Sequence, residues 1–148
     1  MDYKDLRVLI TDDSSGVRVL TEKVLNSFGI TKIMHAANGR EAIVRLEQAV
    51  EAGEAFDLVL CDLNMPVIDG QGLLKRVKES QLPKVSSVMF IVVTAESDKE
   101  TVLDLIKTGI DGFIIKPVVR KDLFHKLNDV FKRRGRAEMP ASVLMNKI

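Results

Sequence analysis

The sequence predicts an α/β domain in which five strands alternate with five helices around a doubly wound parallel sheet. Five short apolar runs end on polar or turn residues, as buried strands do. Segments with the apolar spacing of amphipathic helices separate these runs. This alternation favours parallel strands joined by right-handed crossovers. The predicted strands are residues 6–10, 32–36, 57–61, 88–93 and 113–115.

The first two predicted helices have recognisable ends. Ser14 and Ser15 are suitable N-caps for a helix over 15–28, and Gly29 fits the position just past its end. Asn38 and Glu41 resemble a capping box that opens the second helix, which ends near residue 53. The apolar residues expected on the inner faces of these helices are Val17, Leu20, Val24, Leu25 and Phe28, then Ala42, Ile43, Leu46, Ala49 and Val50.

The second half of the chain continues the same alternation. Leu73, Leu74 and Val77 indicate a short third helix, and Leu82-Pro83 is expected to close it because the residue before proline disfavours helix. Run 88–93 is apolar throughout, as expected of a central strand covered on both faces.

Two more helices complete the pattern. Ser97 and Glu100 form a capping box that opens the fourth helix, which Gly109 ends. Its apolar residues, all expected to face inward, are Val102, Leu103, Leu105 and Ile106. The final helix extends to about residue 134, after which residues 135–148 are predicted to be a tail or linker to the single domain 1–134.

Composition restricts the class of protein. With 46% hydrophobic and 29% charged residues, the chain resembles a soluble globular domain. A formal net charge of +1 gives no reason to expect nucleic acid or an anionic membrane as a partner. No apolar run approaches the roughly 18 residues of a membrane span. With one cysteine and no secretory signal pattern, a cytoplasmic protein is the simplest interpretation.

Reactive residues follow four of the predicted strands. Asp12 and Asp13 follow the first strand, Asp62 the third, Thr94 the fourth and Lys116 the fifth. Parallel strands about 4.8 Å apart place their carboxyl ends along one edge, so these side chains are expected to converge there.

Clustered carboxylates repel each other unless a cation lies among them. Mg²⁺ suits such a site because it binds one or two carboxylates together with water and phosphate oxygens. Lys116 adds a positive charge and Thr94 a hydroxyl donor. Aspartate is a competent nucleophile for phosphoryl groups, and the cations would stabilise the negative charge on the phosphoryl oxygens.

These residues make the chain resemble the receiver domains of two-component response regulators, most closely the single-domain chemotaxis (CheY-like) type. The resemblance rests on Asp12-Asp13, Asp62 in the segment DLNMP, Thr94-Ala95 and Lys116-Pro117, and it covers residues 5–134. It implies the flavodoxin-like strand order 2-1-3-4-5, which is the order known for CheY itself. It also implies a cis Lys116–Pro117 bond.

The resemblance further implies a function. Asp62 would accept a phosphoryl group from the phosphohistidine of a histidine kinase or phosphotransfer protein, so the chain would not be an enzyme beyond its own phosphorylation and dephosphorylation. Mg²⁺ would be held by Asp13, Asp62 and the Asn64 backbone carbonyl, with Asp12 acting through water. Thr94 and Lys116 would sense the phosphoryl oxygens. The surface made by the fourth helix, fifth strand and fifth helix would then bind a downstream protein.

Three positions refine this resemblance. Phe113 stands where the family often has tyrosine, so it is either a switch aromatic without a hydroxyl or a core residue. Asn64 and Glu96 occupy the positions that tune hydrolysis of the acyl phosphate, and the same pair occurs in fast-resetting chemotaxis regulators. Otherwise they are exposed polar loop residues.

Other interpretations remain open at this point. Cys61 is expected to be a small buried hydrophobe, and His35 and His125 to be structural or surface residues. A haloacid-dehalogenase phosphatase would need a DxDxT pattern, which Asp12-Asp13-Ser14 does not match. A flavodoxin-like cofactor carrier would need a phosphate-binding loop after the first strand, but Asp12 and Asp13 at that position would repel a phosphate. The chain could also be the receiver fragment of a larger multidomain regulator.

Overall fold

The computed structural model describes residues 2–95 and 98–145. Its five strands form one sheet in the order β2-β1-β3-β4-β5, and all four neighbouring pairs are parallel. This arrangement confirms the predicted fold class and strand order. The strands are β1 (Arg7–Thr11), β2 (Lys32–Ala36), β3 (Leu58–Cys61), β4 (Met89–Thr94) and β5 (Gly112–Ile115).

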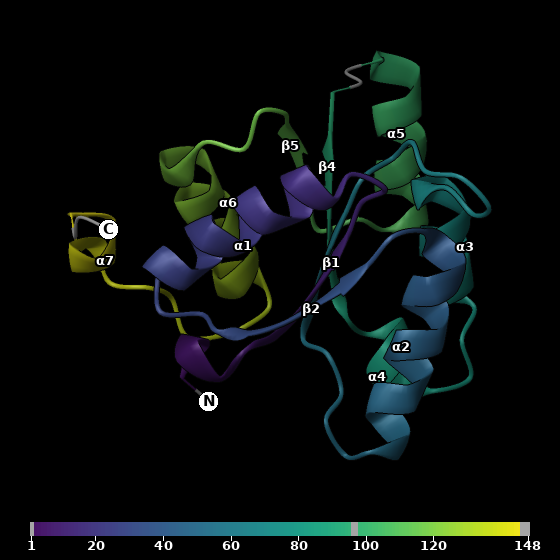
Figure 1. Cartoon of the computed structure of the whole chain (residues 1–148), viewed down its shortest axis with the longest axis horizontal. Helices are drawn as coiled ribbons and strands as arrows, with labels where there is room; N and C mark the ends of the chain where they lie inside the picture. Colours follow the sequence, from purple (N-terminus) through teal and green to yellow (C-terminus); the bar gives the residue numbers. More distant parts are fainter. Residues whose placement is uncertain (1, 96–97, 146–148) are drawn as a thin grey trace.

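Helices cover both faces of the sheet, as Figure 1 shows. On one face α1 and α6 pack over a core that includes Leu25, Phe28 and Phe131. On the other, α2 to α5 pack over Leu46, Val77 and Leu105. The helices are α1 (Ser15–Ser27), α2 (Gly39–Glu51), α3 (Gly70–Lys78), α4 (Pro83–Ser86), α5 (Lys99–Thr108), α6 (Arg120–Arg133) and α7 (Ala141–Met145), with a 3₁₀ turn η1 (Tyr3–Asp5) before β1.

The predicted caps of the first two helices are present. The Ser14 hydroxyl accepts from the Val17 N–H, and the Asn38 side chain accepts from the Glu41 N–H at 2.9 Å. Within the described residues, the Glu41 carboxylate accepts from Arg45 one turn later and not from the Asn38 N–H, so only the Asn38 half of the predicted capping box is formed. For α5, the cap is Asp98, whose carboxylate accepts from Thr101 N–H, whereas the predicted cap Ser97 lies outside the described residues.

One prediction about the third helix was wrong. Lys78 is its last residue, so Leu82-Pro83 does not close it. Pro83 instead begins the short helix α4, because a proline ring already has the backbone angle of a first helical residue and needs no N–H donor there. The buried Val85 anchors this turn beneath α2 and α3.

Three apolar residues predicted to face inward are exposed. Leu20 on α1 is 64% exposed, and Leu103 and Ile106 on α5 are 47% and 56% exposed. In α5 only Leu105 is fully buried. The apolar spacing identified these helices correctly. However, their apolar faces are wider than the area that packs against the sheet, so Leu20, Leu103 and Ile106 lie on the surface.

Residues 136–145, within the segment predicted as a tail or linker, pack against α1 and α6. Met139 and Val143 are buried in the same core as Phe131. The Asn128 amide pairs with both backbone groups of Met139, accepting from its N–H at 2.8 Å and donating to its carbonyl at 3.0 Å. Arg120 donates to the Val143 and Leu144 carbonyls at the end of α7.

Replacing Asn128 with alanine should therefore lower the free energy of unfolding by about 1–2 kcal/mol, because two hydrogen bonds to one backbone position are lost. Urea denaturation followed by circular dichroism measures this change. Asn26→Ala, at an exposed position of α1, serves as the control and should change stability by less than about 0.5 kcal/mol. Equal stability of the two variants would contradict the packing described for the C-terminal segment.

The carboxylate of Asp111 fastens the turn before β5 to the end of α6. It accepts from Arg134 Nε at 2.8 Å and Nη2 at 3.0 Å, and from the Phe90 N–H at 2.8 Å. Burial alone would raise the pKa of Asp111, but the hydrogen bonds from Arg134 and Phe90 outweigh it and lower the pKa below its ordinary value. Arg134 also donates to the Ser87 and Val88 carbonyls, which joins three loops at this point.

A lowered folded-state pKa gives a stabilisation that is fully present above the unfolded pKa of about 3.9 and is lost as the pH falls through the folded value. The Asp111→Asn variant should accordingly be less stable than the parent by a constant amount between about pH 5 and pH 7, and the difference should shrink below about pH 4. Urea titrations at several pH values test this. A difference that stays constant down to about pH 2 would exclude the proposed linkage.

Candidate functional site

Asp12 and Asp62 lie side by side because β1 and β3 are neighbours in register. Thr11 stands opposite Cys61, so each aspartate is the first residue after its strand. The Asp62 N–H donates to the Thr11 carbonyl at 2.9 Å, which continues the ladder to the strand ends. Both side chains are buried, and the predicted convergence of these acids is therefore present in the structure.

Lys116 reaches both acids from the end of β5. Its Nζ lies 2.7 Å from Asp12 Oδ2 and 3.2 Å from Asp62 Oδ2. Burial alone would lower the pKa of this ammonium, but the hydrogen bond and charge of Asp12, together with those of Asp62, raise it. The ammonium is thus held in its charged form between the carboxylates. The Lys116–Pro117 peptide bond that follows is cis.

Asp13 completes an acidic cluster with Asp12 and Asp62. Carboxylate oxygens of the three residues lie within 4.8 Å of one another, with Asp13 exposed and the other two buried. Three carboxylates and one ammonium leave two excess negative charges. Oxygen donors with this charge balance fit a hard divalent cation such as Mg²⁺.

The other predicted site residues are placed around this cluster. Thr94 is fully buried at the end of β4, and its carbonyl accepts from the Lys116 N–H at 2.9 Å. Asn64 is exposed, and its N–H donates to Asp62 Oδ1 at 3.4 Å. Phe113 is half-buried and packs against the core beneath α2 to α5. Glu96 lies outside the described residues.

The backbone of Asp62 is closely packed. The Cys61 thiol donates to the Asp62 carbonyl at 3.0 Å. Burial, followed by the nearby Asp62 charge, raises the pKa of Cys61 well above its ordinary value, which keeps the thiol protonated. Gly70, the first residue of α3, approaches so closely that a Cβ there would lie 2.5 Å from the Asp62 carbonyl oxygen.

The loop from β3 to α3 contains a strained residue. Val67 has φ = 69° and is 71% exposed. This left-handed conformation is unfavourable for a β-branched side chain by about 1–2 kcal/mol. The strain lies five residues after Asp62, in the loop that also carries Asn64.

Substitution Val67→Asn should raise the free energy of unfolding by about 1 kcal/mol, because asparagine adopts the left-handed conformation at much lower cost. Thermal and urea denaturation measure the effect. Val44→Asn provides the control, since Val44 is also an exposed valine, at 47%, but lies within helix α2. A Val67→Asn variant no more stable than the parent would show that the loop relieves this strain in another way.

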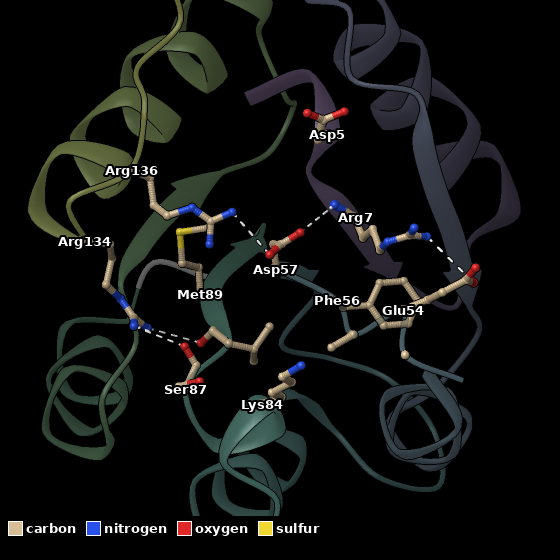
Figure 2. Close-up of a pocket in the computed structure, with 13 residues that line it drawn as sticks. Asp5, Arg7, Glu54, Phe56, Asp57, Lys84, Ser87, Met89, Arg134 and Arg136 are labelled. Carbon is tan, nitrogen blue, oxygen red and sulfur yellow. Dashed lines mark hydrogen bonds and ion pairs between the residues drawn. The ribbon is translucent and has the colours of Figure 1, made fainter. Parts of the chain in front are cut away.

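A separate hollow of about 510 Å³ lies at the opposite edge of the sheet, where the strands begin. Figure 2 shows Arg136 paired with Asp57 and Arg7 paired with Glu54 among its charged side chains. Arg136 lies 3.2 Å from Asp57 and Arg7 lies 3.7 Å from Glu54. These pairs join β1, β3 and the turn after α6, and the hollow takes no part in the acidic site.

Sequence reasoning missed one group that contacts the site. Arg18 Nη1 donates to the Asp12 carbonyl, and Arg18 Nε donates to His35 Nδ1 at 3.3 Å. The other ring nitrogen of His35 contacts the Glu22 carboxylate. The spacing of Arg18 and Glu22, four residues apart on α1, could have suggested a shared face, but the partner on β2 could be identified only in three dimensions.

Comparison with known proteins assigns the chain to a family. The family model for the response regulator receiver domain matches residues 8–128, and the chain belongs to this family. It is therefore a receiver domain of the kind that serves two-component signalling. Within residues 2–95 and 98–145, no helix combines the length and the apolar character that crossing a bilayer requires.

Its relatives include chemotaxis proteins of the CheY group. Chemotaxis protein CheY-3 of Vibrio cholerae is 29% identical over 130 residues, which cover 88% of this chain and 95% of that protein. Chemotaxis protein CheY of Pseudomonas aeruginosa is 27% identical, covering 86% and 98%. The crystal structure of the CheX–CheY–BeF₃–Mg²⁺ complex from Borrelia burgdorferi matches with a TM-score of 0.77 and 28% identity, covering 85% of this chain and 89% of that chain.

Proposed function

We propose that Asp62 accepts a phosphoryl group from a phosphohistidine on a histidine kinase or phosphotransfer protein. The observation that carries this proposal is the Lys116 ammonium bridging Asp12 and Asp62 beside a third carboxylate. In the transfer, an Asp62 carboxylate oxygen attacks phosphorus and forms a P–O bond. The P–N bond to the donor imidazole breaks, and the released imidazole takes up a proton.

The surrounding residues have distinct tasks in this reaction. Asp13, Asp62 and the Asn64 backbone carbonyl would hold Mg²⁺, with Asp12 acting through water. When bound, the ion supplies positive charge against the phosphoryl oxygens. Lys116 would stabilise the same oxygens with its positive charge, and the Thr94 hydroxyl would donate to them. Attack of water on the acyl phosphate later releases inorganic phosphate and resets Asp62, and Asn64 and Glu96 tune that rate.

An output surface is supported by exposed apolar side chains on α5, at the end of β5 and before α6. Leu103 and Ile106 on α5, Ile115 at the end of β5 and Val119 before α6 are 47%, 56%, 53% and 47% exposed. This α5-β5-α6 surface corresponds to the family's fourth helix, fifth strand and fifth helix, because α4 is an additional short turn here. Phosphorylation would draw Thr94 toward the phosphoryl group and repack Phe113, which biases this surface toward a downstream protein.

The chemistry is tested by incubating the protein with acetyl phosphate and Mg²⁺ and measuring intact mass. We expect one phosphoryl group on the parent protein and none on Asp62→Asn. The exposed Asp129→Asn variant of α6 is the matched control and should be modified like the parent. Modification of Asp62→Asn at the parental level would exclude Asp62 as the acceptor. A pull-down with and without beryllofluoride would then identify proteins that bind the α5-β5-α6 surface.

A further inference from the structure

Asp12 is held by its neighbours through both its backbone and its side chain. Its N–H donates to the Ala36 carbonyl on β2 at 3.1 Å, and its carbonyl accepts from Arg18 Nη1. Of its carboxylate oxygens, Oδ1 accepts from the Ser14 N–H at 2.9 Å and Oδ2 from Lys116 at 2.7 Å. The Arg18 contact differs from the others because it acts on the peptide that joins Asp12 to Asp13.

That peptide determines where Asp13 lies. A peptide unit is planar, so fixing the Asp12 carbonyl also fixes the N–H and Cα of Asp13. The Asp13 side chain is exposed and makes no hydrogen bond or ion pair with any residue that the structure describes. The orientation of the preceding peptide is therefore the main constraint on the exposed member of the acidic cluster.

Arg18 is itself held by His35, which contacts Glu22 in turn. Its Nε–H donates to His35 Nδ1, so the ring proton of His35 lies on Nε2 and is donated to Glu22. His35 immediately precedes Ala36 on β2, which means that this strand contacts Asp12 directly through Ala36 and indirectly through Arg18. The planar guanidinium can serve both acceptors at once because its donors diverge in a fixed fork.

We propose that Arg18, held by His35, is a positioning residue that orients the Asp12–Asp13 peptide for Mg²⁺ binding. This inference rests on the proposed function, because it assigns Asp13 to the ion. Charge repulsion alone predicts the opposite change in Mg²⁺ affinity. A guanidinium beside a cation site repels the ion, so removing its charge would tighten binding. If positioning dominates, removing Arg18 weakens binding, and the sign of the change separates the two effects.

The test is isothermal titration calorimetry of Mg²⁺ into the full chain. We expect Arg18→Ala to weaken Mg²⁺ binding about tenfold, the size typical of residues that orient metal ligands. Arg18→Lys should weaken it as well, because lysine keeps the charge but cannot bond both the carbonyl and the ring. The exposed Arg76→Ala on α3 is the control and should bind like the parent. Unchanged or tighter binding in Arg18→Ala would overturn the proposal.

A double-mutant cycle tests whether His35 acts through Arg18. His35→Phe keeps a ring but removes the acceptor, and it should weaken Mg²⁺ binding in the parent but not in the Arg18→Ala background. If His35→Phe weakened Mg²⁺ binding equally in the parent and in the Arg18→Ala background, His35 would not act through Arg18. Urea denaturation of each variant, together with the increase in Tm produced by Mg²⁺, provides a check that does not depend on calorimetry.

Phosphorylation by acetyl phosphate, measured in parallel, separates this inference from the proposed function. At saturating Mg²⁺ the Arg18→Ala variant should be phosphorylated within about twofold of the parental rate, with the loss confined to low Mg²⁺. A parent protein that binds Mg²⁺ but is never phosphorylated would refute the proposed function and leave the role of Arg18 measurable. A normal parent with an unchanged Mg²⁺ dependence in Arg18→Ala would refute only the role of Arg18.

Discussion

Replacing Gly70 with alanine is expected to lower the free energy of unfolding by about 3 kcal/mol, near the upper end for overpacked sites. The added Cβ would lie 2.5 Å from the Asp62 carbonyl oxygen and 2.8 Å from Leu63 Cα. Both atoms belong to the backbone, so no side-chain rotation relieves the clash. Because the displaced backbone carries Asp62, phosphorylation should fall together with stability.

Gly16→Ala is the matched control for this substitution. Gly16 lies in the first turn of α1, where a Cβ would have only the Ser14 hydroxyl within 4 Å, at 3.8 Å. Alanine favours helix over glycine, so this variant should be as stable as the parent or more stable by up to about 1 kcal/mol. Chemical denaturation of the three proteins measures both effects. A Gly70→Ala variant with parental stability would mean that α3 can move away from Asp62 at little cost.

Lys116→Met is expected to produce the second large effect. The ammonium lies between two almost fully buried carboxylates, at 2.7 and 3.2 Å. Removing one partner of a buried ion pair leaves uncompensated charge, so without divalent ions the free energy of unfolding should fall by about 3 kcal/mol. Mg²⁺ should restore part of this loss and raise the Tm of the variant more than that of the parent.

The same substitution should slow phosphorylation by acetyl phosphate about 100-fold, since a positive group aimed at the phosphoryl oxygens is lost. Lys121→Met, at an exposed position in the first turn of α6, is the control and should leave both stability and phosphorylation near parental values. Rates and Mg²⁺-free stability are measured on the same preparations. A Lys116→Met variant with parental values for both would remove the main support for the proposed function.

The sequence predicted the sheet well because the central strands β1, β3 and β4 are buried apolar runs, each with a polar residue at or directly after its end. Parallel pairing in the strand order that the family resemblance implied then brings Asp12, Asp62 and Lys116 together. The strand ends were accurate to about one residue. Thr11, for example, lies within β1 although the predicted strand stopped at residue 10.

The predictions that were wrong or missing concern which surface each helix packs against, which the sequence alone does not give. Apolar spacing reports that a helix has a hydrophobic side, but it does not say whether the sheet or another protein covers that side. Leu103 and Ile106 were therefore predicted to face inward and are exposed on the α5-β5-α6 surface. Likewise, the contact from Arg18 to His35 joins α1 and β2 across 17 positions and leaves no local pattern in the sequence.

The packing of α7 has a practical consequence for handling this protein. The match to the family model ends at residue 128, within α6, whereas the hydrophobic core includes Met139 and Val143. A polypeptide that stops at residue 128 would lack Met139 and Val143 and would expose the apolar residues of α1 and α6 that these side chains cover. Truncations and C-terminal fusions should therefore keep the chain through the end of α7, so that the hydrophobic core stays covered.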